Sequence, residues 1–178
     1  MFSILTIILA LSVALPGALA LFIAPKHREF CRNIPRNRTV GVILALGALL
    51  WAAHEAEVML EGGLARFIPL LNILAPIIAF LSYFFLAYLA TRAFCGLLLL
   101  LITRTLHEAF VIHLPARPVF SALCYIVALM AMVLIAQPWM LREFFEKSAK
   151  SKRFRALTAS VCGTVALAFA LFALLGLS

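Results

Sequence analysis

Two His-Glu pairs and an arginine stand inside apolar stretches of the sequence. His54 and Glu55 interrupt one stretch. His107 and Glu108 interrupt another, with Arg104 about one helical turn earlier. A charge near the hydrocarbon centre of a membrane costs roughly 2.5 to 3.5 kcal/mol even on an insertion scale, so such groups usually face a protein interior, a water cavity or a ligand. Imidazole beside carboxylate is chemistry suited to moving a proton or an ion.

The composition is typical of a membrane protein with several spans. Of the 178 residues, 66% are hydrophobic and 12% are charged, whereas soluble proteins average about half apolar and a quarter charged. Runs of about 20 apolar residues cross a hydrocarbon core as helix. The chain contains six such runs, at residues 2–24, 39–60, 67–90, 93–112, 119–141 and 156–177. We therefore predict an all-α bundle of six transmembrane helices that forms a single domain, 1–178, with bends at Pro76 and Pro138.

The basic residues predict how this bundle is oriented. Five of the 15 Lys and Arg residues lie within 26–38, six lie within 142–155, and Arg92 separates the third and fourth runs. Cytoplasmic segments carry the Lys and Arg excess, so we expect these segments inside and both termini outside the cytoplasm, in the cell (inner) membrane. The net charge of +8 also predicts attraction to anionic lipids, at about 1 kcal/mol per basic residue near the surface. No nucleic-acid fold signature accompanies the charge, so no nucleic acid partner is predicted.

The two His-Glu pairs also suggest an internal repeat. They are separated by 53 residues, and this offset aligns the second and third predicted helices with the fourth and fifth. Both copies are hairpins that start on the same side, so the repeat is parallel, about an axis along the membrane normal. Coincidence is the alternative, because apolar helices share Leu and Ala by composition.

Helical rise places both pairs at one depth. At about 1.5 Å per residue, they lie roughly 21 to 24 Å from the inner ends of their helices, in the outer third of the membrane. The predicted polar intramembrane layer consists of His54, Glu55, Glu57, Asn72, Arg104, His107 and Glu108. Arg104 and Glu108 have the i, i+4 spacing of a helical pair, but basic before acidic is the weaker order. A further carboxylate from the second helix, Glu55 or Glu57, is therefore expected at Arg104.

Two interpretations of this layer stay open. The first is structural or interfacial, because long basic side chains extend toward the membrane surface and Glu108 is only about 8 Å below it. The second is a ligand or proton site, which could include haem b held by His54 and His107. His107 and His113 do not have the spacing of a zinc motif, so no metal site is predicted.

The last predicted helix carries small side chains at steps of three or four residues. They are Ala159, Gly163, Ala166 and Ala170. Small residues let a second helix approach closely. The partner is either another helix of this chain or another subunit.

These patterns predict a non-enzymatic subunit, or an assembly or stability factor, of a larger membrane complex. The expected partners are other membrane subunits or a second copy of the chain. The alternative is a small proton- or ion-coupled transporter that uses the polar layer. A layer confined to one leaflet and a small-residue face favour the first function, whereas a polar path across the membrane would favour the second.

Cysteine labelling tests the predicted orientation. In a background without native cysteines, an impermeant maleimide added from outside should label Gly63→Cys and miss Lys150→Cys, because the basic segments are held inside. The reverse pattern would contradict the orientation. A terminus found inside would contradict an even number of spans.

Overall fold

A computed structural model describes residues 1–23, 38–59, 68–85, 88–114 and 116–176. All regular structure in these segments is helical, which confirms the all-α prediction. The elements are α1 (Phe2–Ala18), the π-helical turn η1 (Leu19–Ile23), α3 (Arg38–Met59), α4 (Ile68–Phe85), α5 (Leu89–Val111), α6 (Arg117–Ala136), α7 (Trp139–Lys150) and α8 (Lys152–Leu175).

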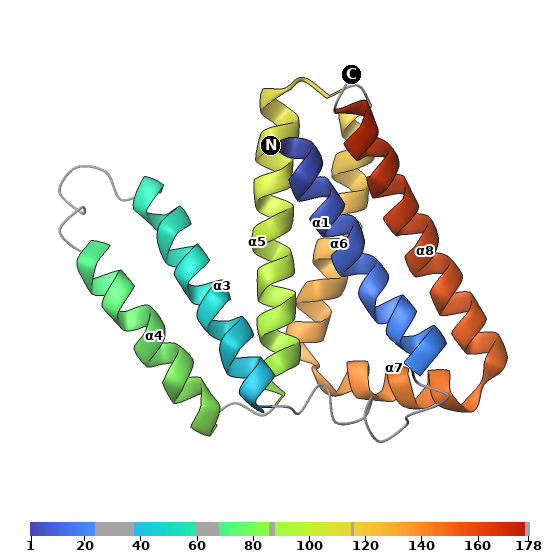
Figure 1. Ribbon diagram of the computed structural model, residues 1–178, viewed down its shortest axis with the longest axis horizontal. Coiled ribbons are helices and arrows are strands. Elements are labelled where there is room, and N and C mark those ends of the chain that lie inside the picture. The colour runs from blue at the N-terminus through green and yellow to red at the C-terminus, as the bar shows by residue number, and fades with distance from the viewer. Residues whose placement is uncertain (24–37, 60–67, 86–87, 115, 177–178) are drawn as a thin grey trace.

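The helices form a bundle with a hairpin at its side and a short helix across one end (Figure 1). Helix α1 packs on α8 and α5, and α6 packs on α5. The α3–α4 hairpin joins this group through contacts between α3 and α5. Helix α7 lies across the end of the bundle opposite both termini (Figure 1). Membrane orientation itself stays a prediction, and Gly63 and residues 26–37 lie outside the described residues.

Within the described segments, five helices are long and apolar enough to cross a membrane. They are Phe2–Phe22, Thr39–Glu57, Leu89–Val111, Arg117–Ala136 and Lys152–Leu175. The third predicted span corresponds to α4, whose apolar stretch Pro69–Ser82 is shorter, with Pro76 inside the helix. The fold is that of a multi-pass membrane protein, whereas the count of six spans and the internal repeat stay predictions.

The fifth predicted span, 119–141, is wrong at its C-terminal end. Helix α6 stops at Ala136, and Pro138 is the N-cap of α7 instead of a bend within one long helix. A residue before proline is pushed out of helical geometry, and Gln137 has φ −125° and ψ 69°. Most of the basic segment that follows, 142–155, is helical, in α7 and the start of α8.

Helix α7 is amphipathic. Phe145 and Ser148 are buried, and Phe145 packs with Leu19 and Leu141. The opposite side carries i, i+4 ion pairs, Arg142 with Glu146 at 2.9 Å and Lys147 with Glu143 at 3.7 Å. A helix with one apolar and one charged face lies in a membrane interface better than across it.

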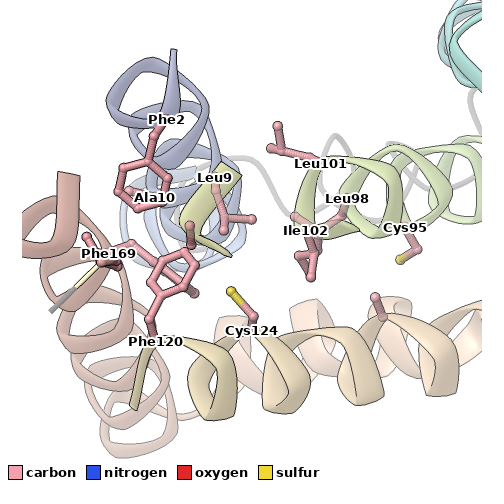
Figure 2. Close-up of a cluster of buried hydrophobic side chains, with 13 residues drawn as sticks. Phe2, Leu9, Ala10, Cys95, Leu98, Leu101, Ile102, Phe120, Cys124 and Phe169 are labelled. Atoms are coloured by element: carbon pink, nitrogen blue, oxygen red, sulfur yellow. The ribbon is translucent and has the colours of Figure 1, made fainter. Parts of the chain in front are cut away.

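The main core lies where α1, α5, α6 and α8 meet, and its aromatic part is near the termini. Phe2, Phe120 and Phe169 point toward one another from α1, α6 and α8 (Figure 2). Edge-to-face contacts link Phe120 to Phe2, to Phe169 and to Phe172, with ring centroids 5.3 to 5.9 Å apart. Aromatic pairs of this geometry add about 0.5 to 1.5 kcal/mol beyond the area they bury. Because the pairs join three helices, they fix the end of the bundle that holds both termini.

The four small residues of α8 do not all face the same surroundings. Ala159 lies on the α1 side, where a Cβ on Gly17 would come within 3.8 Å of its Cα and 2.7 Å of the Cys162 Cβ. Ala166 packs against the core. Gly163 has nothing within 4 Å of its Cβ position, and Ala170 is exposed. The four residues are therefore not one docking face: Ala159 and Ala166 face the bundle, whereas Gly163 and Ala170 face outward.

Helices α3 and α5 come into close contact near the residues where each helix begins. A Cβ on Gly41 would stand 2.8 Å from the Ala90 backbone nitrogen and 3.0 Å from the Leu89 Cβ. Ala45, Leu89 and Ala93 form a small buried cluster beside it. We call this contact the α3–α5 seam. It brings two backbones together where a larger residue would hold them apart.

A pair of glycine variants tests the seam. Gly41→Ala forces a methyl group against the backbone of α5, whereas Gly47→Ala adds the same group where nothing lies within 4 Å. Overpacking typically costs about 1 to 3 kcal/mol, so we expect Gly41→Ala to be less stable than Gly47→Ala by that amount. Thermal unfolding of both variants in one detergent measures the difference. Equal stabilities would mean that α3 does not pack on α5 at this position.

Candidate functional site

The α3–α5 seam sets the height of the polar residues further along both helices. Helices α3 and α5 run side by side in the same direction (Figure 1). Glu55 follows Gly41, and Arg104 follows Leu89, by about four helical turns each. A seam that pairs Gly41 with Leu89 and Ala90 therefore brings Glu55 and Arg104 to the same level.

At that level Arg104 lies between two carboxylates. Its Nη1 is 3.6 Å from Glu55 Oε2 on α3, and its Nη2 is 3.9 Å from Glu108 Oε1 on α5. The Trp51 indole Nε1 donates a hydrogen bond of 3.1 Å to the other oxygen of Glu55. We call Trp51, Glu55, Arg104 and Glu108 the Arg104 cluster. Both helices contribute two of its members.

The cluster combines strong charge with moderate burial. The side chains of Arg104 and Glu55 are each 35% exposed, and that of Glu108 is 19% exposed. The two N–O distances exceed the 2.7 to 2.9 Å typical of charge-assisted hydrogen bonds, so these are ion pairs without a direct hydrogen bond. With both carboxylates ionised, the cluster carries one net negative charge. The indole donor offsets part of it by bonding to the ionised form of Glu55.

The sequence-based prediction for Arg104 is confirmed in its geometry. A carboxylate from the preceding hairpin was expected at this guanidinium in addition to Glu108, and Glu55 provides it. Glu57, the other candidate, instead lies 3.5 Å from His54 Nδ1 one turn away on α3. Adjacent helical residues point about 100° apart, which explains why Glu55 reaches α5 and His54 does not.

The remaining residues of the predicted layer are not part of the Arg104 cluster. His54 has a 78% exposed side chain, and His107 is exposed on α5. Asn72 belongs to α4, but its side chain lies outside the described part of the structure. The structure therefore brings together three of the seven predicted residues, Glu55, Arg104 and Glu108.

Haem b would need two imidazoles facing each other across α3 and α5. Both histidines are exposed instead, and His54 is turned to Glu57. Glu55 and Arg104 occupy the contact between the helices. This geometry does not fit a bis-histidine haem. In the described segments, no group of three or more His, Cys, Asp or Glu side chains could hold a metal ion.

Trp51 is the member that sequence reasoning missed. It packs against the main apolar cluster. Its indole N–H, however, needs a partner when it is removed from water. The signal was present in the sequence, since Trp51 and Glu55 are spaced i, i+4 and so lie on one face of a helix.

The cluster is suited to holding two helices in one register. Each charged member has a partner of opposite sign, so separating α3 from α5 would expose unpaired charges to hydrocarbon. Glu108 is the least exposed carboxylate and lies furthest from its cation. It is therefore the member with the weakest compensation for its charge.

Comparisons with protein-family models, with curated proteins and with solved structures found no match. The fold defines the class, a helical multi-pass membrane protein. Function beyond that class has to be inferred from this chain's own residues.

A set of variants measures how much the Arg104 cluster contributes to the free energy of unfolding. Arg104→Ala leaves two carboxylates without a cation, and we expect it to lower the free energy of unfolding by about 1 to 3 kcal/mol. Loss of a partner from a fully buried pair costs about 3 to 5 kcal/mol, but a third of the Arg104 side chain is exposed. Adding Glu55→Gln should recover part of the loss, because the amide is neutral and still accepts from Trp51.

The matched control is His107→Ala, which removes an exposed polar side chain from the same helix. It should change stability by no more than about 0.5 kcal/mol. Thermal unfolding in one detergent measures all variants. A mild effect of Arg104→Ala, below about 1 kcal/mol and additive with Glu55→Gln, would show that Arg104 is hydrated and unpaired.

Proposed function

We propose that the protein is a non-enzymatic subunit, or an assembly or stability factor, of a larger membrane complex. The observation that carries this proposal is the α3–α5 seam. About four helical turns from the Arg104 cluster, Gly41 lies against the α5 backbone, and Ala45, Leu89 and Ala93 are buried beside it. Apolar side chains packed this closely leave no room for water at this contact. A path from the cluster along the α3–α5 contact would therefore end at closely packed apolar residues, which favours a structural ion pair over a conducting path.

In this proposal the Arg104 cluster holds the α3–α4 hairpin against the bundle. Helix α4 packs mainly on α3. Its other side presents large exposed apolar residues, among them Ile73, Ile77 and Phe80. A hairpin fixed by one ion-pair cluster and one seam can present such a face in a defined position. A partner helix in the membrane can then pack on it by shape.

The outward side of α8 is the second candidate surface. Gly163 and Ala170 lie there beside Leu167. Small residues on an exposed helix face let a partner backbone approach closely, whereas lipid alone does not require them. Other membrane subunits or a second copy of this chain are the proposed partners.

The alternative function is a proton- or ion-coupled transporter. It is supported by the number of titratable side chains at one level, His54 with Glu57 and Arg104 with two carboxylates. In such a transporter, the path of the proton or ion would have to bypass the α3–α5 seam. The two functions differ in what the isolated chain does in a lipid vesicle.

Two variants of α8 test the proposal. Gly163→Leu adds a side chain where this chain has no atom within 4 Å of the Cβ position, so the isolated protein should keep its unfolding temperature. If a partner docks there, the variant should lose much of the complex, because the helices can no longer approach. Leu167→Ile, on the same exposed side, is the matched control and should assemble normally. Native gels of mild-detergent extracts measure both.

Equal assembly of the two variants would mean that this side of α8 faces lipid. Flux measurements on vesicles that contain the purified chain address the alternative directly. We expect no dissipation of an imposed proton gradient. A flux that Glu108→Gln abolishes would contradict the proposed function and support transport.

A further inference from the structure

The outward side of α3 differs from an ordinary lipid-facing surface. Helix α3 lies between α4 and α5 (Figure 1) and has its main contacts with these two helices. Within residues 41–57, the exposed residues are Ile43, Gly47, Leu50 and His54. Apart from the helix's own backbone, no atom of the described chain lies within 4 Å of a Cβ built on Gly47. The side chain of His54 is 78% exposed.

Helix α1 shows the contrast. Within residues 2–17, its exposed residues are Ile4, Ile7, Ile8, Leu11 and Leu15. Large apolar side chains of this kind suit contact with acyl chains. Small residues in spans serve close contacts between helices, and ionisable groups in spans almost always face protein or water. The exposed side of α3 is therefore expected to contact protein.

The spacing of these residues is that of two paired helices. Ile43, Gly47, Leu50 and His54 follow one another at steps of four, three and four residues, and one more step of three reaches Glu57. This is the spacing of the a and d positions at which two helices pack side by side. We call these five residues the α3 stripe. It extends for about 21 Å along the helix.

The last two residues of the α3 stripe are polar. His54 Nδ1 lies 3.5 Å from Glu57 Oε2 of its own chain. A carboxylate accepts several hydrogen bonds and an imidazole has a second ring nitrogen, so both keep capacity for a further contact. They stand in the last turn of the apolar stretch Thr39–Glu57. Hydration at the membrane surface would account for His54 but not for Gly47, which lies about 10 Å deeper.

The α3 stripe is complementary to itself. All copies of a membrane protein insert in the same direction, so the axis of a twofold dimer lies along the membrane normal and equivalent residues meet at the same depth. Gly47 then faces Gly47 of the second copy, where small residues let two backbones approach. In this kind of pairing, a side chain at one position packs beside the next position of the other helix. His54 therefore meets Glu57 of the second copy, and the contact occurs twice.

We propose that the α3 stripe pairs two copies of this chain in a twofold dimer. In this dimer the helices cross closely at Gly47, and the imidazole of each His54 contacts Glu57 of the other copy. The α3 stripe is separate from the outward side of α8. The dimer therefore does not depend on whether another subunit docks on α8, and the two can be tested apart.

Cysteine cross-linking of the full chain in phosphatidylcholine bilayers tests the dimer. In a background without native cysteines, Leu50→Cys places a thiol on the α3 stripe, and the twofold axis brings two such thiols together. Mild oxidation should convert most of the protein to a covalent dimer. The matched control is Leu11→Cys on α1, at a side chain that is 64% exposed, and it should cross-link much less. Equal yields would show random collision and overturn the proposal.

A glycine variant tests the close crossing. Gly47→Leu adds a side chain where the chain itself leaves space, so the monomer should keep its unfolding temperature. The helices can no longer approach, and we expect the dissociation constant of the dimer to rise about tenfold, within the range that overpacking costs. Analytical ultracentrifugation over a dilution series in mild detergent measures it.

The matched control is Gly163→Leu, on the outward side of α8, which should leave this dimer unchanged. If Gly163→Leu dissociates the dimer and Gly47→Leu does not, the second copy docks on α8 and the α3 proposal is wrong, while the function proposed above stands. An unmodified chain that stays monomeric throughout the series would also overturn the proposal.

A double-mutant cycle tests the polar contact. His54→Ala should raise the dissociation constant of the dimer about three- to tenfold, the range for one polar contact between transmembrane helices. Adding Glu57→Ala should then raise it little further, because the two residues act on one contact. His107→Ala removes another exposed imidazole and should have no effect. If His54→Ala is equally silent, His54 is hydrated at the membrane surface and the proposed contact with Glu57 of the second copy is wrong.

Discussion

The ion pair between Arg104 and Glu55 is the contact on which the place of the α3–α4 hairpin depends. In water such a pair contributes about 0 to 1 kcal/mol, and a protein could replace it easily. In hydrocarbon the balance changes, because neither charge can be solvated once the helices separate. The pair, with its distance of 3.6 Å, therefore contributes little by its own attraction. It matters mainly because separating the helices would leave its charges unsolvated in hydrocarbon. Only one register of α3 against α5 gives both charges a partner.

The α3–α5 seam and the Arg104 cluster act together on that register. Near the start of both helices, Gly41 allows backbone contact with α5. About four turns further along, Trp51 and Glu108 complete the partners of the ion pair. A seam of small residues alone would permit sliding, since apolar helices in lipid have no hydrophobic reason to choose one offset. The charges select the offset, and the seam keeps the two helices close enough for the charges to meet.

Much of this was predictable from helical periodicity and depth. The all-α fold, the common level of the polar residues and a carboxylate from α3 at Arg104 all follow from a rise of about 1.5 Å and a turn of about 100° per residue. Periodicity did not predict which neighbour each small residue of α8 faces, because the rotation of a helix about its own axis cannot be derived from spacing alone. Steps of three and four put Ala159 and Gly163 on one ridge in the sequence, but in α8 the first faces α1 and the second faces outward. A ridge of small residues is wide enough to be shared between two neighbours.

The amphipathic helix α7 was missed for a different reason. Its first residues continue the apolar run of α6, and its charged remainder has no apolar run of its own. Transmembrane helices also tolerate proline, so Pro138 by itself predicts a bend within one helix and not the boundary between two. The pattern from Trp139 to Lys150, with aromatic residues among charges, has helical periodicity without the length of a span. An interfacial helix is therefore recognised by its amphipathic periodicity, whereas a spanning helix is recognised by the length of its apolar run.

The central claim is that Glu55 of α3 is in contact with Arg104 of α5. Solid-state NMR of the protein in lipid bilayers, with ¹³C-labelled glutamate and ¹⁵N-labelled arginine, measures this contact directly. We predict a dipolar coupling between the Glu55 Cδ and the Arg104 guanidinium nitrogens, assigned by its loss in Glu55→Gln. A Glu55 carboxyl carbon with no coupling to Arg104 would contradict the account.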